Sequence, residues 1–257
     1  MVLPMVNGVL LDLSGVLYLG DQPIHGSIEA LVRLQATGLP ILYVTNTTRK
    51  PRHQIWQQLD AMQFPIQEKD IFTAPMAAHA WLVSQTLSPY LLIHPSLKPD
   101  FADLTSENPD AVLVGDAAED FTYAHMNTAF RYLIDGAPLI AMGKNRYFME
   151  QDGLSLDSGT YVTALEYAAG VEAIITGKPA VEFFSAAVKA INSTAPSVVM
   201  VGDDVDADVN GAIDAGLLGV LVQTGKYRQE DDNRLIQKDT PVVKDFSAAT
   251  EWIINQL

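Results

Sequence analysis

Short apolar runs rich in β-branched residues alternate with amphipathic segments at both ends of the chain, and this alternation restricts the possible folds more than any other feature. The expected strands cover residues 6–12, 40–45, 172–176, 197–201 and 219–222. The expected helices cover residues 27–37, a segment that begins at Pro51, residues 181–191 and residues 209–215. Strands that alternate with helices predict an α/β fold with a doubly wound, Rossmann-like parallel sheet.

The middle of the chain is expected to form a second α/β unit. It has strand patterns at residues 90–93, 111–114 and 138–141, and helix patterns at residues 123–133 and 161–168. Loops rich in Pro, Asp, Asn and Ser separate these segments. We therefore predict a catalytic core formed by residues 1–74 and 177–257, and an inserted cap domain formed by residues 75–176.

Composition restricts the partners. The 257 residues include 31 acidic and 16 basic side chains, a net charge of −15, and such a surface repels nucleic acid and anionic lipid. No apolar run approaches the length of a membrane span and no signal peptide is recognisable, so we expect a cytoplasmic protein. The absence of cysteine excludes disulfides and thiolate metal sites. An anionic substrate would need local positive charge or a metal ion.

Four polar sites each follow an apolar run directly. They are Asp12 after residues 9–11, Thr45 and Asn46 after residues 41–44, Lys178 after residues 174–177, and the pair Asp203 and Asp204 after residues 198–202. In an open parallel sheet, ligands bind outside the carboxyl ends of the strands. We therefore expect the four sites to converge, although they are far apart in the sequence.

The chemistry of these side chains is complementary. A carboxylate such as Asp12 can attack phosphorus and form an aspartyl phosphate. The Thr45 hydroxyl, the Asn46 amide and the Lys178 ammonium can share the negative charge of a transferring phosphoryl group. The carboxylates of Asp12 and Asp203 are hard oxygen ligands that suit Mg²⁺. The set predicts a Mg²⁺-dependent enzyme that acts on a small phosphorylated compound.

The same motifs, taken in order, resemble the haloacid-dehalogenase superfamily of phosphatases, in the branch with a large α/β cap. The resemblance covers nearly the whole chain and rests on residues 12–18 (DLSGVLY), 44–48 (VTNTT), 163–168 (TALEYA), 177–179 (GKP), 201–204 (VGDD) and 224–227 (TGKY). It implies that the cap closes over the site and chooses the substrate. It also implies a possible homodimer.

The resemblance assigns roles to individual residues. It implies that Asp12 is the nucleophile and a metal ligand, that Asp203 is the second metal-binding acid, and that Ser14 offers its backbone carbonyl to the metal. Phosphate binding is implied for Asp12, Leu13, Ser14, Thr45, Asn46 and Lys178. Asp204 or Asp208 is expected to hold a metal-bound water or to orient Lys178.

Ser14 departs from the commoner pattern, in which a second Asp protonates the leaving group. General acid–base help is worth roughly 100- to 10,000-fold in rate, and a serine hydroxyl is a poor substitute for a carboxylic acid. We therefore expect weak turnover of substrates with alkoxide leaving groups. Pyrophosphate and phosphoramidates, whose leaving groups need less protonation, should depend less on this residue.

Three other functions have to be weighed against a phosphatase. The missing acid at Ser14 would also suit a catalytically weak phosphate-binding or scaffold protein of the same fold. A receiver domain uses similar residues, but there the acid pair comes early and the Lys last, whereas Lys178 precedes Asp203 and Asp204 here. A dehalogenase is possible within the superfamily, but the Thr45–Asn46 pair, Lys178 and Asp203 fit phosphate and Mg²⁺ better.

Overall fold

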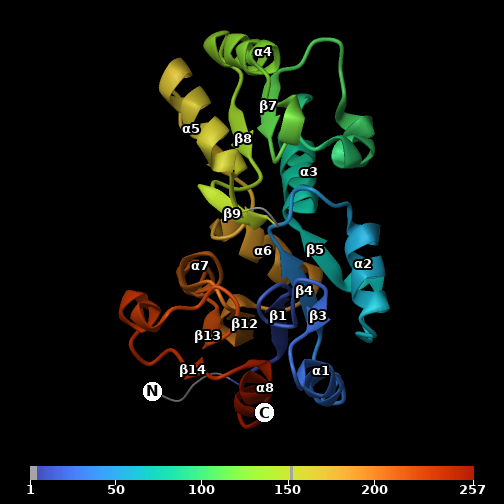
Figure 1. Cartoon of the computed structure of the whole chain (residues 1–257), viewed down its shortest axis with the longest axis vertical. Coiled ribbons are helices and arrows are strands. Elements are labelled where there is room, and N and C mark those ends of the chain that lie inside the picture. The colour runs from blue at the N-terminus through green and yellow to red at the C-terminus, as the bar shows by residue number, and fades with distance from the viewer. Residues whose placement is uncertain (1–4, 151–152) are drawn as a thin grey trace. The chain divides into compact units, whose positions relative to one another are not determined.

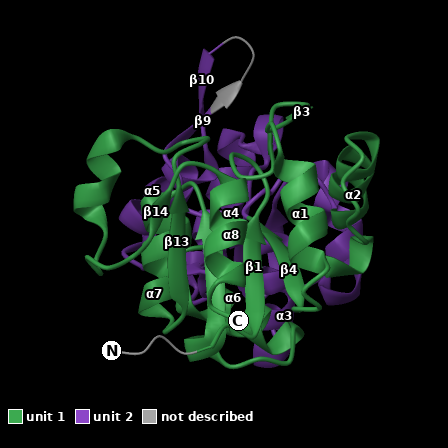
Figure 2. Cartoon of the chain, turned by 90° about the horizontal axis from the view of Figure 1, so that it is seen from below, with its two compact units in different colours: residues 1–45, 52–72, 178–257 green, residues 46–51, 73–177 purple. Residues whose placement is uncertain are grey.

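The structure is a computed structural model that describes residues 5–150 and 153–257. The chain divides into two compact units, shown in different colours in Figure 2. The first unit contains Met1–Thr45, Arg52–Phe72 and Lys178–Leu257, and the second contains Asn46–Pro51 and Thr73–Gly177. The predicted assignment of residues 75–176 to a cap that controls specificity remains a prediction.

The first unit is built on a six-stranded sheet (Figure 1). Its order is β14-β13-β12-β1-β4-β5, and the strands are β1 (Gly8–Asp12), β4 (Ile41–Thr45), β5 (Ile71–Thr73), β12 (Val198–Gly202), β13 (Leu218–Val222) and β14 (Val242–Val243). The central strand β1 pairs in parallel with β12 on one side and β4 on the other. All five residues of β1 are buried, as expected for a strand covered on both faces. The predicted α/β doubly wound parallel fold is confirmed.

Helices cover both faces of this sheet. They are α1 (Ser27–Gln35), α2 (Arg52–Ala61), α6 (Val181–Ala190), α7 (Gly211–Asp214) and α8 (Phe246–Ile254), with short turns η1 (Glu68–Asp70), η4 (Ala195–Ser197), η5 (Val205–Asn210) and η6 (Gln229–Arg234). Val220 and Val222 belong to the core cluster of α1, α2 and α8, whereas Leu221 packs with Ile213 of α7. Because successive strand residues point to opposite faces, α7 lies on the face opposite α1 and α8.

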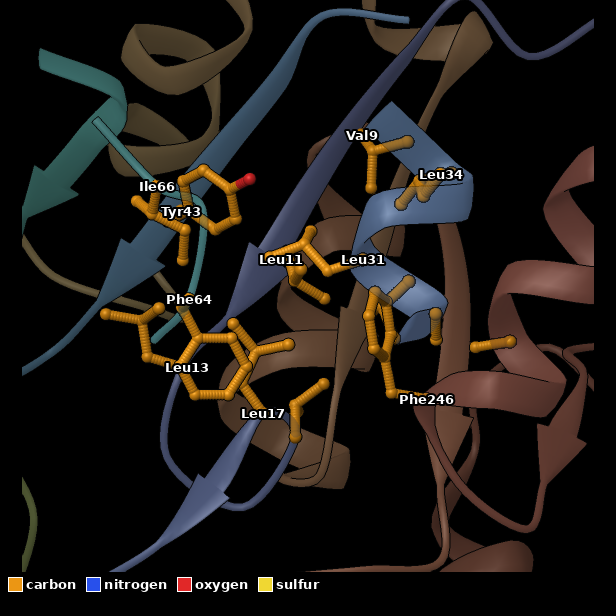
Figure 3. Close-up of a cluster of buried hydrophobic side chains, with 14 of the residues drawn as sticks. Val9, Leu11, Leu13, Leu17, Leu31, Leu34, Tyr43, Phe64, Ile66 and Phe246 are labelled. Carbon is orange, nitrogen blue, oxygen red and sulfur yellow. The ribbon is translucent and has the colours of Figure 1, made fainter. Parts of the chain in front are cut away.

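The core cluster that α1, α2 and α8 share fixes the position of β1. Val9 and Leu11 pack with Leu31 and Leu34 of α1 and with Phe246 of α8 (Figure 3). All these side chains are buried. A buried Leu contributes about 2 kcal/mol through the apolar surface it removes from water. The interior of this cluster therefore holds β1 in a fixed register, and with it the residue at its carboxyl end.

The second unit has its own parallel sheet, with the order β11-β8-β7-β6. Its elements are α3 (Ala74–Gln85), β6 (Pro89–Leu92), η2 (Pro95–Leu104), β7 (Ala111–Val114), η3 (Ala118–Asp120), α4 (Tyr123–Ile134), β8 (Leu139–Ala141), β9 (Tyr147–Glu150), β10 (Gly153–Leu156), α5 (Ser158–Ala169) and β11 (Ile174–Ile175). One core cluster lies under α3 and η2, and another under α4 and α5. In the second unit, β9 and β10 form a short antiparallel hairpin. In the first unit, β2 (Tyr18–Leu19) forms another with β3 (Gln22–Pro23).

One strand prediction led to a wrong expectation. The run at residues 172–176 was expected to end at the same sheet edge as the other three sites. It forms the short strand β11, which pairs with β8 in the sheet of the second unit. The strand has only two residues, and the pattern of so short an apolar run does not indicate which of the two sheets it joins.

None of the helices in the described part of the chain combines the length and the apolar character that crossing a bilayer requires.

Candidate active site

Asp12 is the last residue of β1, at the carboxyl edge of the first unit's sheet. Its side chain is buried. The chain turns sharply directly after it, and Gly15 adopts a φ of +90°, which a residue with a side chain rarely adopts. The backbone N–H of Gly15 donates a hydrogen bond to the carbonyl of Tyr18 at 2.8 Å, and this bond closes the turn. The turn leaves Asp12 at the end of the central strand.

Lys178 lies beside Asp12 although the strand before it belongs to the other sheet. It is the first residue of the first unit after the chain leaves the second. Its Nζ lies 2.5 Å from Asp12 Oδ1 and 2.6 Å from Asp208 Oδ1, and the side chain is buried. Burial lowers the pKa of this ammonium, but the carboxylates of Asp12 and Asp208 outweigh burial and raise the pKa above its ordinary value. Lys178 is therefore a fixed positive charge.

Asp203 follows β12, the neighbour of β1, and Asp208 lies on the next turn, η5. Burial, with added repulsion from Asp12 and Asp208, raises the pKa of Asp203 to about 8. Burial raises the pKa of Asp208 to about 6, although the Lys178 ammonium opposes the shift. A Cβ placed on Gly202 would lie 2.2 Å from the Asp208 Cβ, so only glycine fits beside Asp208 at this position.

Three buried carboxylates meet in this arrangement. One oxygen from each of Asp12, Asp203 and Asp208 lies within 4.8 Å of the others. When these carboxylates and Lys178 are all ionised, three negative charges face one positive charge. Carboxylate oxygens are the ligands that Mg²⁺ and Ca²⁺ prefer, and one divalent cation would neutralise the excess of two charges. The donor set therefore fits a hard divalent cation.

The structure separates the two candidates for orienting Lys178. Asp208 contacts the Lys178 ammonium directly and also accepts a hydrogen bond from the Asp204 backbone N–H at 3.1 Å. The Asp204 side chain instead accepts from the backbone N–H of Asp206 at 3.2 Å, and it pairs with Lys226 Nζ at 3.2 Å. Asp208 is thus the acid that contacts the Lys178 ammonium directly, and the expected role of Asp204 stays a prediction.

The remaining predicted residues have different positions. Thr45 is the half-buried last residue of β4, and Asn46 begins the short segment of the second unit that follows it. Leu13 is buried in the main core cluster, so any contact of this residue with phosphate has to come from its backbone. Ser14 is exposed and forms an isolated bridge with Tyr18. Their binding roles remain predictions.

Sequence reasoning assigned no role to Lys226, although the TGKY motif contains it. Its backbone N–H donates a 2.7 Å hydrogen bond to Asp203 Oδ2. Every residue except proline has a backbone N–H, so the sequence gives no sign of this contact and only the structure reveals it.

Comparison with known proteins identifies the fold and the class. Residues 9–104 match the model of a haloacid dehalogenase-like hydrolase family, and residues 175–249 match that of a related haloacid dehalogenase-like hydrolase family. The human haloacid dehalogenase-like hydrolase domain-containing protein 2 is 41% identical over 98% of this chain and 97% of its own. The zebrafish phospholysine phosphohistidine inorganic pyrophosphate phosphatase is 42% identical over 98% and 96%.

Among solved structures, 4-nitrophenylphosphatase from Thermotoga maritima superposes with a TM-score of 0.89 at 25% identity, over 98% of each chain. These matches make the chain an enzyme of the phosphatase class. It belongs to the haloacid dehalogenase-like hydrolases, which confirms the resemblance found in the sequence.

Proposed function

We propose that the chain is a Mg²⁺-dependent phosphohydrolase in which Asp12 is the nucleophile that attacks a small phosphorylated compound. The observation that carries this proposal is the buried Asp12 carboxylate at the end of the central strand, 2.5 Å from the Lys178 ammonium. The ammonium holds the carboxylate in one orientation and balances its negative charge. An ionised, oriented carboxylate is the form that can act as a nucleophile.

The reaction proceeds in two displacements at phosphorus. An oxygen of Asp12 forms a bond to phosphorus while the bond from phosphorus to the leaving oxygen or nitrogen breaks, and the leaving group departs with the electron pair and takes a proton from solvent. Water then attacks the aspartyl phosphate, gives up a proton to solvent, and releases phosphate with Asp12 regenerated. Lys178 and the Thr45 hydroxyl balance the charge on the phosphoryl oxygens in both steps.

Asp12 and Asp203 would hold the Mg²⁺, with the backbone carbonyl of Ser14 as a further ligand and Asp208 retained as the partner of Lys178. When bound, Mg²⁺ supplies positive charge that offsets repulsion between the anionic nucleophile and the anionic substrate and that stabilises the transition state.

We further propose that the substrates are pyrophosphate, a phosphoramidate or a small phosphate ester with a good leaving group. Ser14 supports this, because its hydroxyl cannot serve as the acid that an alkoxide leaving group needs. The name of the zebrafish relative, which mentions phospholysine, phosphohistidine and pyrophosphate, is consistent with such substrates. We assign the choice among them to the second unit, which has its own sheet and its own hydrophobic clusters.

Hydrolysis of p-nitrophenyl phosphate and pyrophosphate by the parent and by Asp12→Asn tests the proposal. Asp239→Asn is the matched control, since it removes a carboxylate from an exposed position of the same unit. We expect Asp12→Asn to lose at least about a thousandfold in kcat, and Asp239→Asn to retain full activity. Equal activity of Asp12→Asn and the parent would reject the proposal. Phosphate binding without turnover by the parent would instead support the scaffold alternative.

A further inference from the structure

The loop that follows β13 contacts two other parts of the first unit. Lys226 donates its backbone N–H to Asp203 Oδ2 at 2.7 Å. The Thr224 hydroxyl donates a short hydrogen bond to the carbonyl of Gly15, in the turn after Asp12. The loop thus connects the carboxyl ends of β1 and β12, the two strands that supply Asp12 and Asp203.

Two glycines enclose the same oxygen of Asp203. A Cβ built on Gly15 would lie 2.0 Å from Asp203 Oδ2, and a Cβ built on Gly225 would lie 2.0 Å from that oxygen and 2.6 Å from the Gly15 Cα. Real Cβ atoms do not approach other atoms this closely. Because the Gly15 contact is with backbone, it cannot be relieved by turning a side chain. Oδ2 therefore occupies a space that exists only because both residues are glycine.

We propose that the loop of Thr224, Gly225 and Lys226 is a positioning element that fixes the orientation of the Asp203 carboxylate and thereby sets the affinity of the site for a divalent cation. Oδ2 accepts the Lys226 N–H, and Asp203 would offer Oδ1 to a bound cation. Groups that orient a metal ligand typically contribute 10- to 100-fold to metal affinity, since the ligand does not have to be ordered when the metal binds. The inference rests on the proposed cation dependence.

Calorimetric titration of the substrate-free protein with Mg²⁺ tests this role without measuring activity. We expect Gly225→Ala to bind Mg²⁺ about 10- to 100-fold more weakly than the parent, because the new methyl group displaces Oδ2. Gly216→Ala is the matched control. Gly216 precedes β13 and has a similar positive φ, +82° against +61° for Gly225, but a Cβ there meets its nearest atom only at 3.8 Å. Both variants carry the same kind of backbone strain, and only one reaches Asp203.

Two further variants keep the test decisive if Gly225→Ala does not fold. Thr224→Val preserves the shape of the side chain but removes the hydrogen bond to Gly15, and it should weaken Mg²⁺ binding several-fold. Lys226→Ala retains the backbone N–H and should bind Mg²⁺ at least as tightly as the parent, because it removes a nearby positive charge.

The outcomes separate this inference from the proposed function. Equal Mg²⁺ affinity of Gly225→Ala and Gly216→Ala, or of Thr224→Val and the parent, would overturn the positioning role while leaving the Mg²⁺ site intact. Failure of the parent itself to bind Mg²⁺ would overturn both. Weaker binding by Gly225→Ala and Thr224→Val, with Gly216→Ala and Lys226→Ala unchanged or tighter, is the result we expect.

Discussion

Replacing Asp203 with Asn should stabilise the metal-free protein while removing its affinity for a divalent cation. Burial and the carboxylates of Asp12 and Asp208 raise the pKa of Asp203 from 3.8 to about 8. Between these two values the folded protein retains a proton that the unfolded chain has lost, so stability falls as the pH rises. Asn carries no charge, so it avoids this cost, and its amide oxygen can still accept the Lys226 N–H.

The size of the effect follows from the shift in pKa. One pKa unit corresponds to about 1.4 kcal/mol, so a shift of about four units sets an upper limit of about 6 kcal/mol above pH 8. The pKa of Asp208 is also raised, to about 6, so the two carboxylates compete for the same proton. This competition reduces the share of the destabilising free energy that is due to Asp203 alone. We therefore expect Asp203→Asn to gain about 2–3 kcal/mol, or roughly 5–10 °C in Tm.

Thermal unfolding in a chelating buffer at pH 5 and pH 8.5 measures this gain, with Asp239→Asn as the control for losing one surface charge. At pH 8.5 Asp203→Asn should melt above the parent, and at pH 5 the gap should be roughly a third as large, because the cost to the parent grows only above the ordinary pKa of 3.8, where the unfolded chain loses its proton. Added Mg²⁺ should raise the Tm of the parent and leave that of the variant unchanged. A variant less stable than the parent at pH 8.5, or a gap independent of pH, would show that the Asp203 carboxylate does not destabilise the metal-free protein.

Three further substitutions test other parts of the account. Lys178→Met should lower kcat by about 100- to 1000-fold. In the absence of metal it should also lower the free energy of unfolding by about 3–5 kcal/mol, because it removes the ammonium that pairs with two buried carboxylates. An unchanged kcat would contradict the role of Lys178. Ser14→Asp should raise turnover of alkyl phosphates by about 100- to 10,000-fold and that of pyrophosphate much less; an equal change for both substrates would show that the missing acid does not select the leaving group. Leu11→Ala should lower the free energy of urea unfolding by about 2–5 kcal/mol and leave the Kd for Mg²⁺ nearly unchanged. A large loss of Mg²⁺ affinity would show that packing around Leu11 also affects the Mg²⁺ site.

Much of the fold could be predicted because its information is local. The runs that became β1, β4, β12 and β13 are apolar up to the polar residue that ends or follows each of them, which is typical of strands buried on both faces. The positions of Asp12 and Asp203 followed from the same pattern, since each comes at or directly after the carboxyl end of its strand. Strand ends and sheet edges were therefore accessible from the sequence.

The partners of these residues were less accessible. Lys178 reaches Asp12 although the strand before it pairs with β8 in another sheet, so the correct neighbour was predicted for a wrong topological reason. The choice of Asp208 over Asp204 depends on the π-helical turn η5, which sequence periodicity does not indicate. The Lys226 contact is made by a backbone N–H, which every residue except proline carries.

If Asp12 is the nucleophile, it becomes phosphorylated during turnover. Acid quenching of the parent during steady-state hydrolysis of p-nitrophenyl phosphate with Mg²⁺, followed by mass spectrometry of its peptides, measures this directly. We expect a phosphoryl group on the peptide that contains Asp12, and we expect Asp12→Asn to lose both this group and turnover. Rapid turnover with no phosphoryl group at Asp12, accompanied by an active Asp12→Asn variant, would contradict the role of Asp12 as the nucleophile.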